Sequence, residues 1–178
     1  MLKAGMIETG NLRLRRPEIG DLEAIHAMRS DPAVVRFLGG RLLNREEAWH
    51  RLTRIVGHWA LRGYGLFAVV EKHSGRFVGE VGLFDGYRGL SADFDDSPEA
   101  GWILATEAHG KGYAAEAAIA AHRWFAETHG DRRSVCIIAP DNLASLRVAQ
   151  KLGYKRFGEV EYQKAPVVML ERIPGRMA

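Results

Sequence analysis

A glycine turn between an apolar run and an alanine-rich run is the feature that most constrains the fold of this chain. The apolar run covers residues 99–105, the turn contains Gly110 and Gly112, and the helix-forming run begins at Tyr113. Glycine lets a backbone approach a phosphate closely, and successive N–H groups in such a turn form an anion-binding concavity. The helix that follows adds the positive end of its dipole. The segment therefore predicts a strand, a phosphate-binding turn and a helix, and with them a phosphorylated ligand.

Two other phosphate-binding motifs fit this segment poorly. A Walker A loop ends in Gly-Lys-Ser/Thr, whereas Lys111 lies between the two glycines. The dinucleotide fingerprint requires a third glycine, where this chain has Ala115, and it normally follows the first strand of its domain. A nucleotide-binding protein of another class and an ordinary helix-capping turn stay open as alternatives.

The turn resembles motif A of the GNAT superfamily, the acetyl-CoA-dependent N-acetyltransferases. Motif A reads Arg/Gln-x-x-Gly-x-Gly/Ala at the start of a helix, and His109, Gly112 and Ala114 fill these positions here. His109 departs from the pattern, which weakens one expected contact but leaves the backbone of the turn unchanged. The family resemblance therefore rests first on the two small residues.

A second stretch resembles another conserved pattern of the same superfamily. Asn142 and Ser145 fill Asn-x-x-Ser, and residues 151–154 fill the Lys-Leu-Gly-aromatic turn that follows a short helix. The opening residues 9–15 and the run 112–117 favour the branch of ribosomal-protein-alanine (N-terminal) acetyltransferases. The resemblance extends over nearly the whole chain.

The resemblance implies one GNAT-like domain over residues 8–173, of α/β (α+β) class. Such a domain has a mixed, mostly antiparallel sheet of about seven strands, splayed at the cofactor site and flanked by about four helices. Apolar periodicity and turn residues predict the individual elements independently. The expected strands are 12–15, 65–71, 76–84, 99–105, 134–139, 154–162 and 167–172, and the expected helices are 17–30, 44–63, 112–128 and 142–151.

Composition and charge exclude several classes of function. Hydrophobic residues make up 47% and charged residues 26% of the chain, as in soluble globular proteins. No apolar run approaches the ~20 residues that span a bilayer, and residues 1–10 lack the apolar stretch of a signal peptide, so we expect a cytoplasmic protein without a membrane partner. The net charge of +3 comes from interleaved acids and bases, which does not indicate a nucleic-acid surface. The seven histidines are scattered and Cys136 is the single cysteine, in an apolar run, so we expect neither a metal site nor a catalytic thiol.

The resemblance also assigns residues to acetyl-CoA, the expected co-substrate. The turn before the helix would hold the pyrophosphate, and the preceding strand would pair its backbone with the pantetheine arm. Asn142 begins the second motif and is a natural helix N-cap, although in the family the corresponding residue also lies close to pantetheine. The cofactor-binding set is Trp102, Ile103, Leu104, His109, Gly110, Lys111, Gly112, Tyr113, Ala114 and Asn142.

Acetyl transfer to an amine needs a neutral amine, a stabilised oxyanion and a proton for the leaving thiolate. Glu99 and Glu80 are the candidate bases, beside the aspartates of the loop 87–98, and each has an alternative interpretation as a surface carboxylate. Many GNAT enzymes carry a tyrosine seven residues after the asparagine, where this chain has Ala149. Ser145 is therefore the candidate acid, and its alternative role is that of a helix-start hydroxyl.

We expect an N-acetyltransferase that acts by direct transfer through a ternary complex. The acceptor would be a protein N-terminal residue or a small cationic amine such as a polyamine or aminoglycoside. Asp93, Asp95 and Asp96 form either an acidic rim that attracts such an amine or a solvated loop. A non-catalytic acyl-CoA-binding or sensor module on the same fold is the alternative function, because His109 and Ala149 depart from the pattern. The sequence is compatible with a monomer and with a homodimer.

Overall fold

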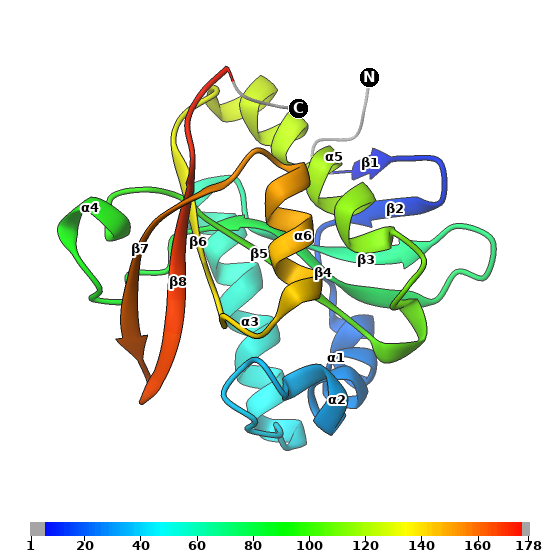
Figure 1. The fold of residues 1–178 in the computed structure, drawn as a ribbon. Coiled ribbons are helices and arrows are strands. Elements are labelled where there is room, and N and C mark those ends of the chain that lie inside the picture. The colour runs from blue at the N-terminus through cyan, green and yellow to red at the C-terminus, as the bar shows by residue number, and fades with distance from the viewer. Residues whose placement is uncertain (1–5, 176–178) are drawn as a thin grey trace.

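The computed structural model describes residues 6–175, and these form a single α/β domain around one sheet (Figure 1). Residues 1–5, part of the N-terminal stretch expected to lack a signal peptide, lie outside the described range. The strands are ordered β1-β2-β3-β4-β5-β6-β8-β7, and every neighbouring pair is antiparallel except β5 and β6. Their bounds are Met6–Glu8 (β1), Leu12–Arg15 (β2), Leu66–Glu71 (β3), Phe77–Phe84 (β4), Glu99–Leu104 (β5), Ser134–Ile138 (β6), Lys155–Tyr162 (β7) and Ala165–Arg172 (β8).

Helices cover both faces of this sheet. In Figure 1, α5 and α6 lie in front of the strands and α3 lies behind them. Within the described residues, no helix is both long and apolar enough to cross a membrane. The helices are α1 (Leu22–Arg29), α2 (Pro32–Val35), α3 (Arg45–Arg62), α4 (Ala92–Asp95), α5 (Tyr113–His129) and α6 (Leu143–Lys151), with 3-10 turns at Ile19–Asp21 and Thr106–Ala108.

The fold class and the four long helices are confirmed, and three short elements were not predicted. Strand β1 adds an eighth strand at the edge of the sheet, where it pairs with β2. Helix α4 lies inside the loop expected over residues 87–98. The first helix was expected to end at residue 30 with no helix directly after it, yet the Asp31 carboxylate accepts a hydrogen bond from the Ala33 N–H and starts α2. An Asp-Pro pair therefore both ends one helix and begins the next.

Local sequence explains why the long helices begin and end where they do. Helix α3 begins with a capping box, in which Asn44 Oδ1 accepts a hydrogen bond from the Glu47 N–H at 2.9 Å. The Glu47 carboxylate in turn accepts one from the Asn44 N–H. It ends at Gly63, which has a φ of 76°. Helix α5 places Ala117 and Ala121 fully buried against the sheet. Small side chains allow this close packing, which fixes the start of α5 beside the end of β5.

The sheet opens between β5 and β6. These two parallel strands share a single pair of opposing residues, Glu99 and Val135. On its other side β5 pairs with β4 along its whole length, from Glu99 to Leu104. The splayed sheet that the family resemblance implies is therefore present, and the second half of β5 has an edge that no strand covers.

Candidate active site

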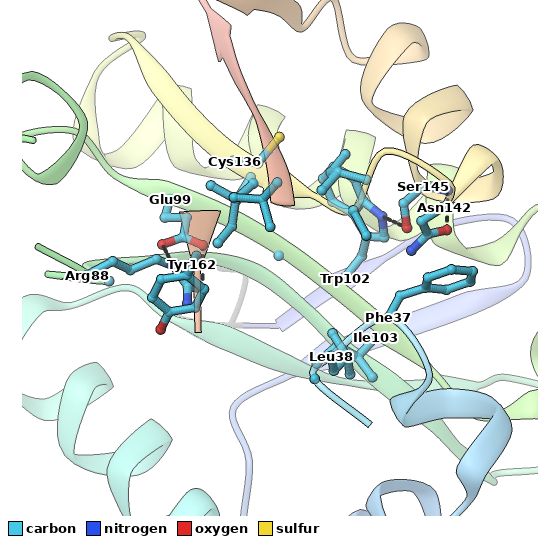
Figure 2. A pocket seen from close by; sticks show the side chains of 18 of the residues that line it. Phe37, Leu38, Arg88, Glu99, Trp102, Ile103, Cys136, Asn142, Ser145 and Tyr162 are labelled. Atoms are coloured by element: carbon cyan, nitrogen blue, oxygen red, sulfur yellow. Dashed lines mark hydrogen bonds and ion pairs between the residues drawn. The ribbon is translucent and has the colours of Figure 1, made fainter. Parts of the chain in front are cut away.

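A cavity of about 1030 Å³ lies at this opening. Its walls come from α1, α3, β4, β5, β6 and the start of α6, together with the β7–β8 hairpin. Figure 2 shows Arg88, Glu99 and Tyr162 on one side of the pocket and Trp102, Asn142 and Ser145 on the other. Of the residues predicted for the site, those lining the cavity are Glu80, Glu99, Trp102, Ile103, Asn142 and Ser145, whereas Leu104 and the turn 109–114 lie outside its lining.

The turn before α5 has the geometry of an anion-binding site. Gly110 and Gly112 have φ values of 74° and 79°, and a Cβ added to either would meet nothing within 4 Å. Within residues 6–175, the N–H groups from Gly110 to Ala115 donate no hydrogen bond, and the first bond at this helix end runs from the Glu116 N–H to the Gly112 carbonyl. A set of unpaired N–H groups at a helix N-terminus that faces open space is suited to a phosphate.

The side chains of this turn point toward a buried carboxylate below it. The Tyr113 hydroxyl donates to Glu71 Oε1 at 2.9 Å, and the Lys111 ammonium lies 3.4 Å from the same oxygen. Ser74 donates to the other oxygen at 2.6 Å. The bonds from Ser74 and Tyr113 hold the pKa of the Glu71 carboxyl at about 2. Glu71 therefore fixes the turn from beneath, and the backbone alone faces the open side.

We expect Glu71→Gln to lower the melting temperature at neutral pH and to flatten its acid dependence. The pKa of about 2 lies below the ordinary value of 4.5, so the carboxylate stabilises the fold fully above pH 4.5 and loses this effect as the pH falls through 2. Glutamine cannot titrate. Thermal unfolding of both proteins from pH 7 to pH 2 should show a difference that is largest at pH 7 and shrinks toward pH 2. A constant difference across the range would contradict the assignment.

His109 connects the turn to β5. Its Nε2 donates to the Leu104 carbonyl at 3.0 Å, because a carbonyl oxygen can only accept. The histidine that departs from motif A thus ties the end of the strand to the start of the turn. This contact accounts for His109 without a direct role toward a ligand.

Strand β5 and helix α6 are joined across the opening. Asn142 Oδ1 accepts from the Ser145 N–H at 3.1 Å and so caps α6. The Trp102 indole N–H donates to Ser145 Oγ at 3.2 Å, as Figure 2 shows. The Ser145 hydroxyl accepts this bond and keeps its own proton available. Asn142 and Ser145 therefore both take part in the cap of α6. The Ser145 side chain also lines the cavity, where its hydroxyl can donate a hydrogen bond.

Glu99 is buried and fully engaged. It is 3% exposed, which excludes the surface interpretation. Arg88 donates to both of its oxygens, from Nε at 2.7 Å and from Nη2 at 2.6 Å. Burial raises the pKa of Glu99, and the Arg88 guanidinium opposes this shift only in part. The carboxylate of Glu99 thus has no oxygen without a donor.

Glu80 has a different environment. It is 1% exposed, and its Oε2 accepts from Arg51 Nε at 2.8 Å. Its Oε1 is also buried but has no hydrogen-bond partner among the described residues. A buried carboxylate oxygen without a donor is rare and costly. Of the two candidate bases, Glu80 is the one with an oxygen left to receive a proton or an N–H group.

The acidic loop binds its own chain. Asp95 accepts hydrogen bonds from the N–H groups of Arg88 and Gly89, and Asp93 lies 3.0 Å from Arg133. None of the three aspartates predicted as a rim, which include Asp96, is among the described residues that line the cavity. The loop interpretation therefore fits better than the rim interpretation.

Cationic and imidazole side chains on α3 are the part of the site that the sequence analysis missed. Arg51, Arg54 and His58 are spaced three and four residues apart and all line the cavity. This spacing was a usable signal, because it forms a polar stripe beside the apolar face of the helix. His58 is not a free base, since its Nδ1 donates to the Tyr64 carbonyl at 2.7 Å and its Nε2 accepts from the Asp85 N–H at 2.9 Å.

Metal and thiol chemistry have little support in the described residues. No group of three or more His, Cys, Asp or Glu side chains within residues 6–175 is placed to hold a metal ion. Cys136 is 1% exposed, and burial raises the pKa of its thiol well above the ordinary value. The thiol is therefore protonated and unreactive at neutral pH.

Comparisons with known proteins agree with this architecture. The acetyltransferase (GNAT) domain family matches residues 11–155. YnaD, an uncharacterised N-acetyltransferase of Bacillus subtilis (strain 168), is 27% identical over 152 residues, which are 85% of this chain and 84% of YnaD. A structure from Bordetella pertussis assigned to the same family is 32% identical, with a TM-score of 0.85 over 94% of this chain and 98% of that one.

The fold is also shared with a structure that contains coenzyme A. RimL, a ribosomal-protein α-N-acetyltransferase solved in complex with coenzyme A, is 18% identical, with a TM-score of 0.75 over 95% of this chain and 98% of that one. At this identity the likeness concerns the fold alone. Together with the family match over most of the chain and the open sheet described above, these findings show that the chain belongs to the GNAT acetyltransferase family.

Proposed function

We propose that the protein transfers an acetyl group from acetyl-CoA to a primary amine. The observation that carries this proposal is the row of unpaired N–H groups from Gly110 to Ala115, which follows directly on the uncovered edge of β5. A pyrophosphate fits such a turn, and an extended amide-bearing arm fits such an edge. The family membership supports acetyl-CoA as the co-substrate.

The residues that would hold acetyl-CoA follow from this arrangement. The backbone of residues 110–114 would bind the pyrophosphate, with Lys111 and Tyr113 acting through their backbone because their side chains contact Glu71. Trp102, Ile103 and Leu104 would pair with the pantetheine arm along the open edge of β5. Asn142 and Ser145 lie on the opposite wall, and His109 would act by holding Leu104.

The chemistry requires one bond to form and one to break. The amine nitrogen bonds to the thioester carbonyl carbon, the carbon–sulfur bond breaks, and the products are an amide and the free thiol of CoA. Glu80 would accept the proton that the amine loses, because its Oε1 has no hydrogen-bond partner in the described part of the chain. The Ser145 hydroxyl would supply a proton to the thiolate and be reprotonated from water. We assign Glu99 the role of holding Arg88 and the cavity wall, since both its oxygens are engaged.

A binding module without turnover is the second candidate function. Ala149, at the position where many GNAT enzymes carry the acid tyrosine, is fully buried. The methyl group of Ala149 has no proton to donate, so this position supplies no acid here. This alternative predicts that CoA binds and that no amine is acetylated.

We expect acetyl-CoA and CoA, but neither ATP nor NAD, to raise the melting temperature. A ligand at ~100 times its Kd adds about 2.7 kcal/mol of stability, which is a shift of roughly 5–10 °C for a domain of this size. A free-thiol assay with a panel of amines then separates an enzyme from a binding module. Stabilisation by ATP or NAD alone would overturn the proposed function, and CoA binding without thiol release from any amine would favour the binding module.

A further inference from the structure

A buried arginine in the cavity wall makes no ion pair with any of residues 6–175. Arg29, at the end of α1, is 9% exposed and lines the cavity. Its Nε is buried and has no hydrogen-bond partner within residues 6–175. Burial, together with the neighbouring positive charges of Arg51 and Arg54, lowers the pKa of Arg29 to about 10, so the side chain is still charged at neutral pH. A buried charge without a partner is costly unless something else compensates it.

Three carboxylates of this wall are each matched by an arginine. Arg51 pairs with Glu80 at 2.5 Å, Arg88 with Glu99 at 2.6 Å, and Asp85 with Arg62 at 2.6 Å. Arg54 is exposed to the cavity, one turn of α3 beyond Arg51, and makes no ion pair among the described residues. Arg36 and Asp141 also line the cavity and make no ion pair among the described residues. The wall therefore carries more guanidinium groups than carboxylates, and Arg29 and Arg54 are the two unpaired ones whose charges interact with Glu80.

This positive excess lies next to the proposed reaction centre. Glu80, whose charge acts on both Arg29 and Arg54, is directly opposite Ile103 in the β4–β5 pair. Ile103 belongs to the segment that would hold pantetheine. An acceptor that placed its amine at Glu80 Oε1 would place its neighbouring groups beside the two arginines. Guanidinium groups bind carboxylates through paired hydrogen bonds, whereas they repel polyamines.

We propose that Arg29 and Arg54 form a carboxylate-binding subsite, and that the acceptor is an amine with a carboxylate close to its amino group. The nature of the acceptor rests on the proposed acetyl transfer, whereas the carboxylate-binding subsite does not. A free amino acid has this chemistry, and so does a peptide whose second residue is acidic. The same subsite disfavours the small cationic amines that the acidic loop suggested.

Matched acceptor pairs test the subsite directly. Each free amino acid is compared with its carboxamide, and each peptide with Asp as its second residue is compared with the Asn peptide. We expect the carboxylate form to have at least a tenfold higher kcat/KM. The basicity of the amine works in the opposite direction, because the amine of the carboxylate form is more basic and is therefore less often neutral than that of the carboxamide. Preference for the amino-acid pair identifies a free amino acid as the acceptor, and preference for the peptide pair identifies an acidic N-terminus.

Substitutions connect the preference to the two arginines. Arg29→Met and Arg54→Met keep an apolar stem and remove the charge. Each is expected to bring the ratio of kcat/KM between the carboxylate and amide acceptors close to one. The KM for acetyl-CoA should stay unchanged. Arg45→Met is the matched control, because Arg45 is on the same helix but pairs with Glu23 at the surface. The control should keep the wild-type ratio.

A binding measurement tests whether the subsite exists, independently of any catalytic activity. Sodium malonate, compared with sodium chloride at equal ionic strength, should raise the melting temperature of the wild type and of Arg45→Met but not of Arg29→Met. This result with no acetylation of any amine would preserve the subsite and refute the proposed function. The subsite would be overturned if the paired acceptors reacted at equal rates and malonate had no effect on the melting temperature. Stabilisation by inorganic phosphate alone would also overturn it. So would an Arg29→Met variant that keeps the wild-type ratio of kcat/KM between the carboxylate and amide acceptors.

Discussion

Gly112→Asp is expected to weaken CoA binding by about two orders of magnitude while the protein still folds. A Cβ added at this position meets nothing within 4 Å, so the side chain starts into open space on that side of the turn. There it faces the proposed pyrophosphate position. Two unit charges of like sign about 6 Å apart repel by about 2.8 kcal/mol at an effective dielectric constant of about 20, which is a loss of about 100-fold in affinity.

Gly112→Asn separates the charge from the backbone effect. Both variants place a similar side chain at a φ of 79°, which costs about 1 kcal/mol for a non-glycine residue but is tolerated best by Asn and Asp. Isothermal titration with CoA should therefore show a moderate loss for Asn and a far larger loss for Asp. If both variants bind CoA like the wild type, the phosphate is held elsewhere and the assignment of the turn is wrong.

Glu80→Gln should reduce kcat by about 100-fold or more, within the range of contributions measured for general bases. The amide retains the size of the side chain and can still accept from Arg51, but it cannot take a proton from the amine. The KM for acetyl-CoA should stay unchanged, because the glycine turn proposed to bind the pyrophosphate lies outside the cavity lining to which Glu80 belongs. Steady-state kinetics with an acceptor identified by the thiol assay measures both values.

Two further variants keep this prediction decisive if the amide weakens the fold. Glu80→Asp preserves the charge beside Arg51 and withdraws the oxygens by one methylene, so it should fold normally and still lose activity. Glu99→Gln breaks a buried pair of the same kind with Arg88, so it controls for the structural damage alone. A larger fall in kcat for Glu99→Gln than for Glu80→Gln would transfer the role of base to Glu99.

The helix caps and the glycine turn could be predicted from the sequence because they depend on neighbouring residues. The capping residues of α3, the glycine turn before α5 and the Asn142 cap of α6 lie where their residue types predict. Strand β1 has three residues and shows no alternation long enough to detect. The role of Asp31 at two successive helices was missed because an Asp-Pro pair is equally typical of a helix end and a helix start.

The cationic wall could not be predicted in the same way. Arg29, Arg51, Arg54 and Arg88 are spread over sixty residues of the sequence and come from two helices and a loop. Each is ordinary for an exposed helix face or a turn, and only the tertiary fold brings them together around two glutamates. The choice between Glu80 and Glu99 likewise depends on which arginine each contacts, which is a property of long-range packing.

The partial pairing of β5 and β6 divides the sheet into two halves. Strands β1 to β5 form one half-sheet and β6, β8 and β7 form the other, and a single pair of opposing residues connects them. The shared hydrophobic core and helix α5 also join the two halves, and an occupant of the seam would add contacts between them. An extended ligand lying along β5 would act as a structural crosslink, so that amide hydrogens in the β7–β8 hairpin would exchange more slowly in the complex although the ligand lies beside other strands. The proposed co-substrate would then also stabilise the fold of the protein that uses it.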